Sequence, residues 1–318
     1  MDSFLYSLNA TVPVFAVMLV GYLLRRIGFL TEEFVTVANK FVFKVCLPCM
    51  LFLDLAQIDI RHQFDGAYIG FCAAVTIISI LSIWGLAKLF LKDKTEVGAF
   101  VQTAYRSSAA ILGIAFIENI YGNSGMGPLM IIGAVPLYNI FAVIILTVES
   151  NDETVRKDKS RIKTTFLNIL KNPIIIGIAL GMLASLIQLK MPHMLEKSVQ
   201  YLGNMASPLA LIAIGAGFEG KKALAKIKPS LVAAFLKLIG LTAIFLPIAV
   251  WLGFRDQKLL ALVIMLASPT TPTAYIMAKN MHGDDVLSSS VIVLTTFFSA
   301  LTLTFWIFIM RYFGYIAG

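Results

Sequence analysis

Apolar residues in this chain gather in long runs, and short polar or glycine-containing breaks separate one run from the next. A helix needs about 20 predominantly apolar residues to cross a bilayer. Ten such runs, called spans 1 to 10 below, follow one another along the 318 residues. They lie near residues 6–28, 35–57, 67–92, 97–119, 126–148, 166–189, 196–218, 229–253, 258–279 and 286–313. The pattern therefore predicts an all-α membrane protein with ten transmembrane helices.

The composition agrees with that pattern. The chain is 58% hydrophobic and 14% charged, whereas soluble domains average about 45–50% and about 25%. The longest polar stretch, residues 149–165, is too short to be a soluble ATPase, kinase or nucleic-acid-binding domain. The net charge of +8 is therefore attributed to the excess of Lys and Arg in the cytoplasmic loops of membrane proteins.

The placement of these basic residues predicts the orientation. With the N-terminus outside, the inside loops hold more than twice as many Lys and Arg residues as the outside segments. The positive-inside rule then places both termini outside. We expect a multi-pass protein of the inner (cytoplasmic) membrane.

The chain repeats itself at an offset of about 160 residues. Three pairs of helix-breaking or small residues share this offset: Pro13 and Pro173, Gly21 and Gly181, and Pro48 and Pro208. Each copy holds five spans, and because five is odd, the second copy enters the membrane in the opposite orientation. Inverted repeats of this kind are typical of secondary transporters. The predicted units are 1–148, a cytoplasmic linker at 149–165, and 166–318. The alternative is coincidence, since Pro and Gly are common in membrane helices.

Span 9 contains the strongest predicted interruption, the sequence Ser-Pro-Thr-Thr-Pro-Thr at residues 268–273. Pro269 and Pro272 each lack an amide donor and clash with the preceding turn. The hydroxyls of Thr270, Thr271 and Thr273 can satisfy freed backbone groups or bind a ligand. Because apolar residues flank the segment on both sides, it is predicted to lie in mid-membrane. A simple proline kink is the alternative.

The matching stretch of span 4 is polar as well, although it contains no proline. Ser108 lies 160 positions before Ser268, and Arg106 and Ser107 precede it. An ionisable side chain deep in a span is costly unless it is paired or faces water, and it marks a functional site by default. A guanidinium here suits bidentate binding of a carboxylate. The alternative is a structural cap or partner for a neighbouring half-helix.

Two further polar positions are equivalent under the repeat. Lys44 lies one turn before Pro48, and Asn204 lies one turn before Pro208. The two prolines are predicted to disturb their helices at related places. Lys44 and Asn204 are therefore kept as repeat-equivalent polar candidates.

Other polar residues within the spans are read individually. Tyr138 and Asn139 follow Pro136 in span 5 and are candidates for the same site. Lys237 in span 8 is expected to extend its amine towards the membrane surface. Asp54, near the outer end of span 2, is interpreted as a solvated helix end. It is the only deep acidic residue, and sodium sites need clustered oxygens, so coupling to protons, or no coupling, is favoured over sodium.

No catalytic or metal-binding pattern stands out in the sequence. His62, His193 and His282 are scattered among loops without ligand spacing. Cys46 and Cys49 form C-x-x-C inside an apolar run, where free cysteines pack as small hydrophobes. We therefore expect no enzyme activity, no metal and no cofactor.

Five segments resemble the auxin efflux carrier family, within the bile/arsenite/riboflavin transporter superfamily, and the chain is similar to its bacterial members. These segments are NKFVFKVCLPCMLF in span 2, YRSSAAILGIAF in span 4, PLYNIFAV in span 5, KNPIIIGIALG in span 6 and SPTTPTAYIMAKNMHGDD in span 9. The resemblance implies two inverted five-helix repeats. Spans 1, 2, 6 and 7 would form a scaffold, often dimeric, and spans 3–5 and 8–10 a mobile transport domain with spans 4 and 9 crossing as broken helices.

Known substrates of the family are mostly organic anions, namely auxin in plants and malate or malonate in bacteria. Family members usually carry asparagine near the crossing in span 4, where this chain has Ser107 and Ser108. The plant mode of substrate binding is therefore not carried over. Arg106 favours a small, strongly charged carboxylate over an aromatic one.

The resulting expectation is a secondary transporter of a small organic anion such as malate or a related dicarboxylate. Pro269 and Pro272 would hold the break open. The residues expected to bind substrate are Arg106, Ser107, Ser108, Tyr138, Asn139, Thr270, Thr271 and Thr273. Lipid, the anion and a second copy of the chain are the expected partners. A non-transporting membrane sensor for a small carboxylate or hormone-like ligand is the first alternative, and an intramembrane enzyme is the second.

Overall fold

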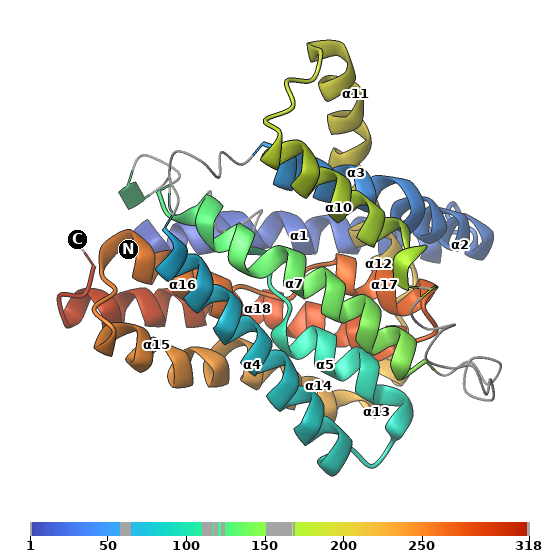
Figure 1. The fold of residues 1–318 in the computed structure, drawn as a ribbon. Coiled ribbons are helices and arrows are strands. Elements are labelled where there is room, and N and C mark those ends of the chain that lie inside the picture. The colour runs from blue at the N-terminus through green and yellow to red at the C-terminus, as the bar shows by residue number, and fades with distance from the viewer. Residues whose placement is uncertain are drawn as a thin grey trace.

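The computed structural model describes residues 2–57, 65–109, 117, 120–121, 125–150, 167 and 169–316, and every regular element it describes is helical (Figure 1). The first half contains α1 (Asp2–Arg26), α2 (Glu32–Phe41), η1 (Val42–Cys46), α3 (Leu47–Ala56), α4 (Gly66–Phe90), η2 (Lys94–Glu96), α5 (Val97–Tyr105) and α7 (Gly127–Val148). The second half contains α10 (Pro173–Leu186), α11 (His193–Asn204), α12 (Ala206–Ala216), α13 (Gly220–Ala225), α14 (Ile227–Phe235), η4 (Leu236–Gly240), α15 (Leu241–Trp251), α16 (Asp256–Ala267), α17 (Thr273–Asn280) and α18 (Asp285–Tyr312). η1 and η4 are single π turns, and η2 is a 3₁₀ turn.

Six helical stretches of the described chain are long and apolar enough to cross a membrane: Glu32–Ala56, Gly66–Phe90, Gly127–Val148, His193–Ala216, Ile227–Trp251 and Asp285–Tyr312. They correspond to spans 2, 3, 5, 7, 8 and 10. Span 1 is the 25-residue helix α1, span 6 contains the shorter α10, and spans 4 and 9 are interrupted. Large apolar side chains such as Phe90 and Trp251 point outwards, as expected for a surface that meets lipid. Most of the predicted linker at 149–165 lies outside the described residues.

The helices pack in corresponding pairs. α1 packs against α12, and α10 packs against α3. Likewise α4 packs against α7, and α14 against α18. Under the 160-residue offset, the pairing of α1 with α12 corresponds to that of α10 with α3, and the pairing of α4 with α7 to that of α14 with α18. The N and C labels lie near the same end of the bundle (Figure 1).

Glycine permits the close approach of α10 to α3. A Cβ atom at Gly177 of α10 would lie 2.7 Å from the carbonyl oxygen of Pro48, and one at Gly181 would lie 2.7 Å from that of Phe52. Small residues at helix contacts are the usual means of close packing in membranes, where lipid offers no hydrophobic driving force between helices. α10 and α3 are thereby held backbone to backbone.

The helix irregularities of spans 2 and 7 lie next to prolines. Pro48 follows the π turn η1, and Pro208 follows the short interruption at Met205 between α11 and α12. A proline has no N–H, so it frees the carbonyl four residues earlier, which belongs to Lys44 in one repeat and Asn204 in the other. Both side chains are exposed on the outside of the bundle.

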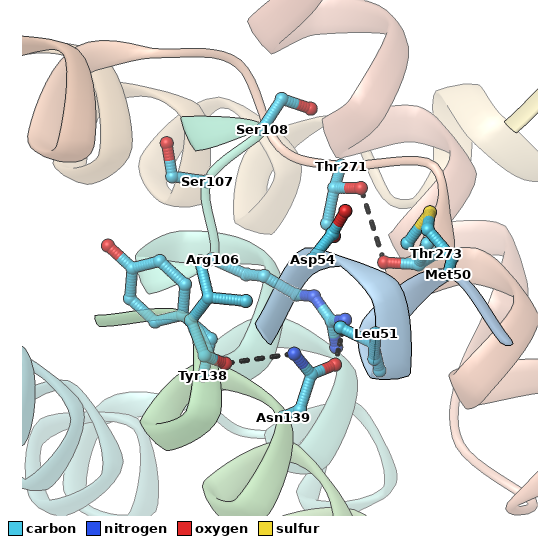
Figure 2. A pocket seen from close by; sticks show the side chains of 11 residues that line it. Met50, Leu51, Asp54, Arg106, Ser107, Ser108, Tyr138, Asn139, Thr271 and Thr273 are labelled. Atoms are coloured by element: carbon cyan, nitrogen blue, oxygen red, sulfur yellow. Dashed lines mark hydrogen bonds between the residues drawn. The ribbon is translucent and has the colours of Figure 1, made fainter. Parts of the chain in front are cut away.

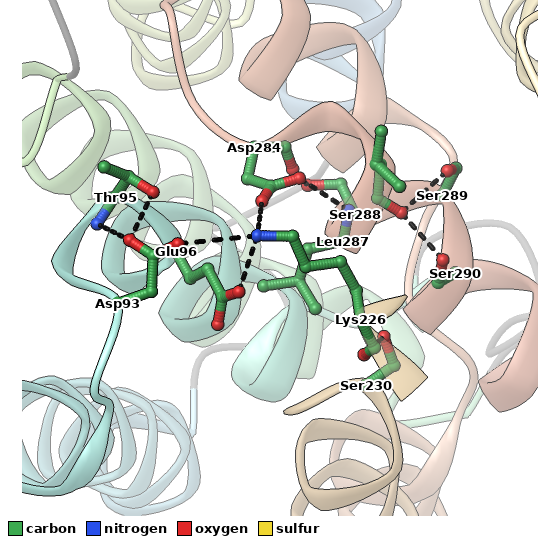
Figure 3. Close-up of polar contacts among 11 residues, drawn as sticks. Asp93, Thr95, Glu96, Lys226, Ser230, Asp284, Leu287, Ser288, Ser289 and Ser290 are labelled. Carbon is green, nitrogen blue, oxygen red and sulfur yellow. Dashed lines mark hydrogen bonds and ion pairs between the residues drawn. The ribbon is translucent and has the colours of Figure 1, made fainter. Parts of the chain in front are cut away.

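Ion pairs join the loops at one end of the bundle (Figure 3). The Lys226 ammonium lies 2.6 Å from Glu96, 3.1 Å from Asp284 and 3.6 Å from Asp93. Burial alone would lower the pKa of Lys226, but the hydrogen-bonded ion pairs with Glu96 and Asp284 outweigh burial and raise it. These contacts tie the start of α5 to the starts of α14 and α18.

A second ion pair joins the starts of α4 and α16. Lys258 lies 2.5 Å from Asp65, which also accepts a hydrogen bond from the Tyr68 amide as the N-cap of α4. The hydrogen bond from Lys258, followed by that from Tyr68, holds the pKa of Asp65 below its usual value. The first half of each interrupted span, α5 or α16, is therefore anchored at its start by a lysine–carboxylate pair.

Candidate functional site

The interruptions of spans 4 and 9 meet inside the bundle. In span 9, α16 ends at Ala267 and α17 begins at Thr273, with Pro269 and Pro272 in the segment between them. In span 4, α5 ends at Tyr105, and Arg106 adopts an extended conformation with ψ 137°. Residues 110–116, which continue span 4, lie outside the described residues. The predicted polar stretches thus coincide with the ends of helices.

Hydrogen bonds link the two segments directly. The amide of Ser108 donates to the carbonyl of Pro269 at 3.0 Å, and the Thr270 hydroxyl donates to the carbonyl of Thr103 at 2.7 Å. The Gln102 side chain donates to the carbonyl of Ala274 at 2.9 Å. The backbone groups that one span leaves unpaired are therefore partly satisfied by the other, as non-helical backbone inside a membrane protein requires.

A small pocket opens beside this meeting point (Figure 2). Seven of the eight predicted substrate residues line it: Arg106, Ser107, Ser108, Tyr138, Asn139, Thr271 and Thr273. They come from three separate parts of the chain, the end of α5, the middle of α7 and the start of α17. Their convergence is a property of the fold, and their roles towards a substrate stay a prediction.

The eighth residue, Thr270, is directed elsewhere. Its hydroxyl binds the Thr103 carbonyl, and its amide donates to the Thr295 hydroxyl of α18 at 3.1 Å. Thr271 and Thr273 point into the pocket with their hydroxyl oxygens 3.2 Å apart (Figure 2). Thr270 is thus placed to hold the two broken spans together rather than to face the pocket.

Arg106 is the charged centre of the pocket. Its side chain is only 3% exposed. One guanidinium nitrogen donates to the Asn139 side-chain oxygen at 2.5 Å, and the other lies 2.7 Å from the sulfur of Met277. Asn139 is held in turn by its own donation to the carbonyl of Val135. Among the described residues, the guanidinium is held by Asn139 and Met277 and forms no ion pair with a carboxylate.

Four lining residues were not candidates in the sequence: Met50, Leu51, Asp54 and Val135. The interpretation of Asp54 as a merely solvated helix end is wrong, because α3 packs beside the crossing and places Asp54, half-buried, on the pocket wall (Figure 2). Only the position of Asp54 one to two turns after Pro48 could have signalled this. Asp54 and Arg106 line one cavity without pairing in the described structure.

The expectation for Lys237 is also wrong. Its side chain is fully buried and points inwards, where the ammonium donates to the carbonyls of Leu266 at 2.5 Å and Met265 at 3.3 Å. The π turn η4 widens span 8 at this residue, and such turns recur at functional sites. The missed signal was Pro269, which frees the carbonyl of Met265 four residues earlier.

A wider cavity at the Lys226 end of the bundle is rich in basic residues. Five of its lining residues are basic, and three are acidic: Arg25, Arg26, Lys221, Lys222, Lys279, Glu32, Glu219 and Asp285. Three of the basic residues form ion pairs with the acidic ones, namely Arg25 with Glu32, Lys222 with Glu219 and Lys279 with Asp285. The lining therefore keeps an excess of two positive charges, those of Arg26 and Lys221.

Over the described residues, no group of three or more histidine, cysteine or acidic side chains is placed to hold a metal ion. The three cysteines are free. Cys46 and Cys72 are buried in the apolar core, where a thiol packs as a small hydrophobe.

Comparison with known proteins assigns the family. The model of a family described as "Membrane transport protein" matches residues 6–307. An uncharacterized transporter of Methanocaldococcus jannaschii is 22% identical over 94% of this chain and 97% of its own length. A protein of Rhizobium meliloti named "Putative malonate transporter" is 24% identical over 94% of each chain.

A third relative is the mouse protein named "Lysosomal cholesterol signaling protein". It is 24% identical over 75% of this chain, a match that spans 29% of the mouse protein. The family match covers nearly the whole chain. The chain therefore belongs to this membrane transport protein family, that of the auxin efflux carriers, and is a multi-pass membrane transporter rather than an enzyme.

Proposed function

We propose that this membrane transport protein is a secondary transporter of small organic anions, such as malate or a related dicarboxylate. The observation that carries the proposal is Arg106, a buried guanidinium in a pocket at the crossing of two interrupted helices, with no carboxylate paired to it among the described residues. A buried charge is costly unless it is compensated. A bound carboxylate would supply that compensation. The excess of positive charge in the wider cavity, near Arg26 and Lys221, would attract the carboxylate.

Substrate binding would use groups already in place. The guanidinium of Arg106 would pair with one carboxylate, with Asn139 fixing its orientation. The hydroxyls of Ser107, Ser108, Thr271 and Thr273 would bind the remaining oxygens. Tyr138 would close one side of the pocket. α17 begins at Thr273 beside the same space, and the first amides of a helix favour a negative charge.

The moving parts would follow from two inverted five-helix repeats, residues 1–148 and 166–318, joined by a cytoplasmic linker at 149–165. The corresponding packings of α1 with α12 and of α10 with α3 support this division. Spans 1, 2, 6 and 7 would form the scaffold, and spans 3–5 and 8–10 the transport domain. The pocket has Met50, Leu51 and Asp54 on the scaffold side and the other lining residues on the transport-domain side, so movement between them would expose it alternately.

The remaining assignments belong to the same proposal. The carrier would lie in a bacterial inner membrane with both termini outside, and two copies would associate through their scaffolds. Protons or no coupling ion are favoured, with Asp54 as the one carboxylate on the pocket wall.

The test is uptake of labelled malate into proteoliposomes of the purified protein, with and without an imposed pH gradient. We expect saturable uptake that excess unlabelled malate or malonate blocks. Arg106→Ala should abolish most of it, while Arg311→Ala, an exposed arginine at the end of α18, should not. Equal uptake by wild type and Arg106→Ala would show that the site assignment is wrong.

The alternative is a membrane sensor that binds a small carboxylate or hormone-like ligand in the same pocket and signals through a partner. The mouse relative, whose printed name is that of a signalling protein, is the observation that favours it. Ligand-dependent thermal stabilisation without any flux, over a panel of mono- and dicarboxylates, would support the sensor and contradict the carrier.

A further inference from the structure

The carbonyl end of α16 is unusual because its last turn lacks two of its normal partners. Pro269 has no N–H to offer the carbonyl of Met265. The amide of Thr270, which could otherwise pair with the carbonyl of Leu266, donates to the Thr295 hydroxyl instead. Two carbonyls are thus freed side by side in the interior of the bundle, where an unsatisfied backbone group is costly.

Lys237 occupies the space in front of both carbonyls. Its ammonium lies 2.5 Å from the oxygen of Leu266 and 3.3 Å from that of Met265, and the residue has no exposed surface. The π turn η4 turns the side chain inwards, and the Trp306 indole donates to the neighbouring carbonyl of Leu238 at 3.0 Å. The site is therefore built by three elements, η4, α16 and α18.

Freed carbonyls at the end of a half-helix are where secondary transporters commonly hold a sodium ion. The C-terminal end of a helix also carries a partial negative charge, which favours a cation. A lysine ammonium is a compact unit positive charge on a flexible stem. We infer that Lys237 is a tethered cation in the place of a bound alkali ion, and that transport consequently requires no sodium. The transport part of this inference rests on the proposed function.

A neutral hydrogen-bond donor would be the simpler explanation of a capped helix end, but one is already present. The Tyr138 hydroxyl donates to the same carbonyl of Met265 at 3.3 Å. A lysine is nevertheless buried beside it, although burial of an amine is expensive. Because Tyr138 also lines the pocket, Lys237 contacts the substrate site through one shared carbonyl. Lys237 is thus a positioning residue rather than a substrate ligand.

The experiment compares cations rather than substrates. The melting temperature of the purified full-length protein is measured in sodium chloride, methylammonium chloride and choline chloride of equal ionic strength. The variants are Lys237→Ala, which empties the site, and Lys237→Gln, which keeps donors but removes the charge. Lys228→Ala, an exposed lysine of the same span, is the matched control.

We expect wild type and Lys228→Ala to melt at the same temperature in all three salts. Lys237→Ala should melt roughly 5 °C or more lower in choline and should recover at least half of this loss in sodium or methylammonium. Lys237→Gln should stay low in all salts. If Lys237→Gln matches wild type, or if Lys237→Ala shows no dependence on the cation, the inference is overturned.

Uptake provides the second readout. Wild-type malate uptake should differ by less than about twofold between sodium and choline, since a tenfold dependence would correspond to about 1.4 kcal/mol of coupling. A sodium requirement of the wild type would overturn the inference even if the Lys237 variants do not fold. If malate and other anions are not carried at all, the proposed function fails, and the melting temperatures still decide whether Lys237 replaces an ion.

Discussion

The interruptions of spans 4 and 9 occupy equivalent places in the chain, but they are produced in different ways. The interruption in span 9 is intrinsic to its sequence, because Pro269 and Pro272 lie only three residues apart and each lacks an amide donor and clashes with the preceding turn. The one in span 4 contains no proline, and its extended segment is held by bonds to span 9, such as that from the Ser108 amide to the Pro269 carbonyl. We therefore expect the conformation of span 4 to depend on span 9.

The two interruptions also differ in their source of positive charge. Span 4 carries its own cation, Arg106, on the interrupted segment itself, facing the pocket. Span 9 has no cation in its interruption and receives one, Lys237, from span 8. Arg106 is thus accessible to a ligand, whereas Lys237 forms its hydrogen bonds with backbone carbonyls. The two charges therefore have separate tasks at two interruptions that the sequence places about 160 residues apart.

Removal of Arg106, the cation that faces the pocket, should have the largest effect on transport. Arg106→Ala should reduce malate uptake about 10- to 100-fold, because a hydrogen bond to a charged group contributes about 1.5–3 kcal/mol. Arg106→Lys should be intermediate, since it keeps a charge but loses the fork that Asn139 orients. Initial rates in proteoliposomes, with Arg311→Ala as control, measure this. Wild-type uptake rates in Arg106→Ala would contradict the proposal that Arg106 is the cation that binds the substrate.

Restoring helix in span 9 should separate activity from stability. Pro269→Ala returns an amide to the carbonyl of Met265, in competition with Lys237, and removes about 3 kcal/mol of resistance to a helical conformation. We expect uptake to fall about tenfold while the melting temperature stays equal or rises. Pro247→Ala, at an exposed position of α15, is the control. A simultaneous fall in both quantities would mean that the interruption is not intrinsic.

The dependence of span 4 on span 9 is tested at Thr270. Thr270→Val removes the hydroxyl that satisfies the Thr103 carbonyl, and a buried unpaired carbonyl costs about 1–3 kcal/mol. A lower melting temperature and faster hydrogen exchange in α5 are expected. Thr302→Val, whose hydroxyl bonds to carbonyls of its own helix, α18, should change neither. Faster hydrogen exchange in α16 alone would show that span 9 depends on span 4 instead.

The ion pairs that hold the starts of α5 and α16 should differ in their contribution to stability. Lys226→Ala leaves Glu96 and Asp284 without their cation, both with side chains less than 15% exposed, and we expect a loss of about 2 kcal/mol. Lys258→Ala breaks one partly exposed pair with Asp65 and should cost less than about 1 kcal/mol. Thermal unfolding of the two variants in parallel measures the difference. Equal losses would contradict this ranking.

The smallest expected effect is a change in melting temperature at low pH. Since the pKa of Asp65 is lowered in the folded protein, its stabilising contribution is complete above the pKa of the unfolded chain, about 3.9. It is lost as the pH falls through the lower folded value. The difference in melting temperature between wild type and Asp65→Asn should therefore be constant above about pH 5 and shrink below about pH 4. A difference that grows in acid would exclude this pair as its cause.

The sequence was sufficient to locate six of the spans as long apolar helices, and to locate the polar stretches, because both depend on local chemistry. About twenty apolar residues define a span, and the closely spaced Pro269 and Pro272 mark an interruption. The position of a side chain around its helix is not local in this sense. Lys237 was expected at the membrane surface because a straight helix leaves its direction open, and the π turn η4 directed it inwards. Asp54 reached the pocket only because α3 packs beside the crossing.

The assignment of hydroxyls shows the same limit. Thr270, Thr271 and Thr273 are equivalent in the sequence, yet Thr270 bonds to backbone and the other two face the pocket. No periodicity distinguishes them, since Thr270 and Thr271 lie between helices and Thr273 is only the first residue of α17. The choice depends on the approach of α5, which only the tertiary structure supplies.

Two positive charges fixed in the proposed transport domain, Arg106 and Lys237, bear on how the carrier responds to membrane voltage. Moving one elementary charge through 100 mV changes its energy by about 2.3 kcal/mol. Two cations and a doubly charged anion together add no net charge to the site as the domain moves, whereas the empty site carries both positive charges across the field. Voltage would then act on the empty carrier alone. Exchange of one dianion for another would proceed equally well at any potential, and net flux would follow the potential through the return step.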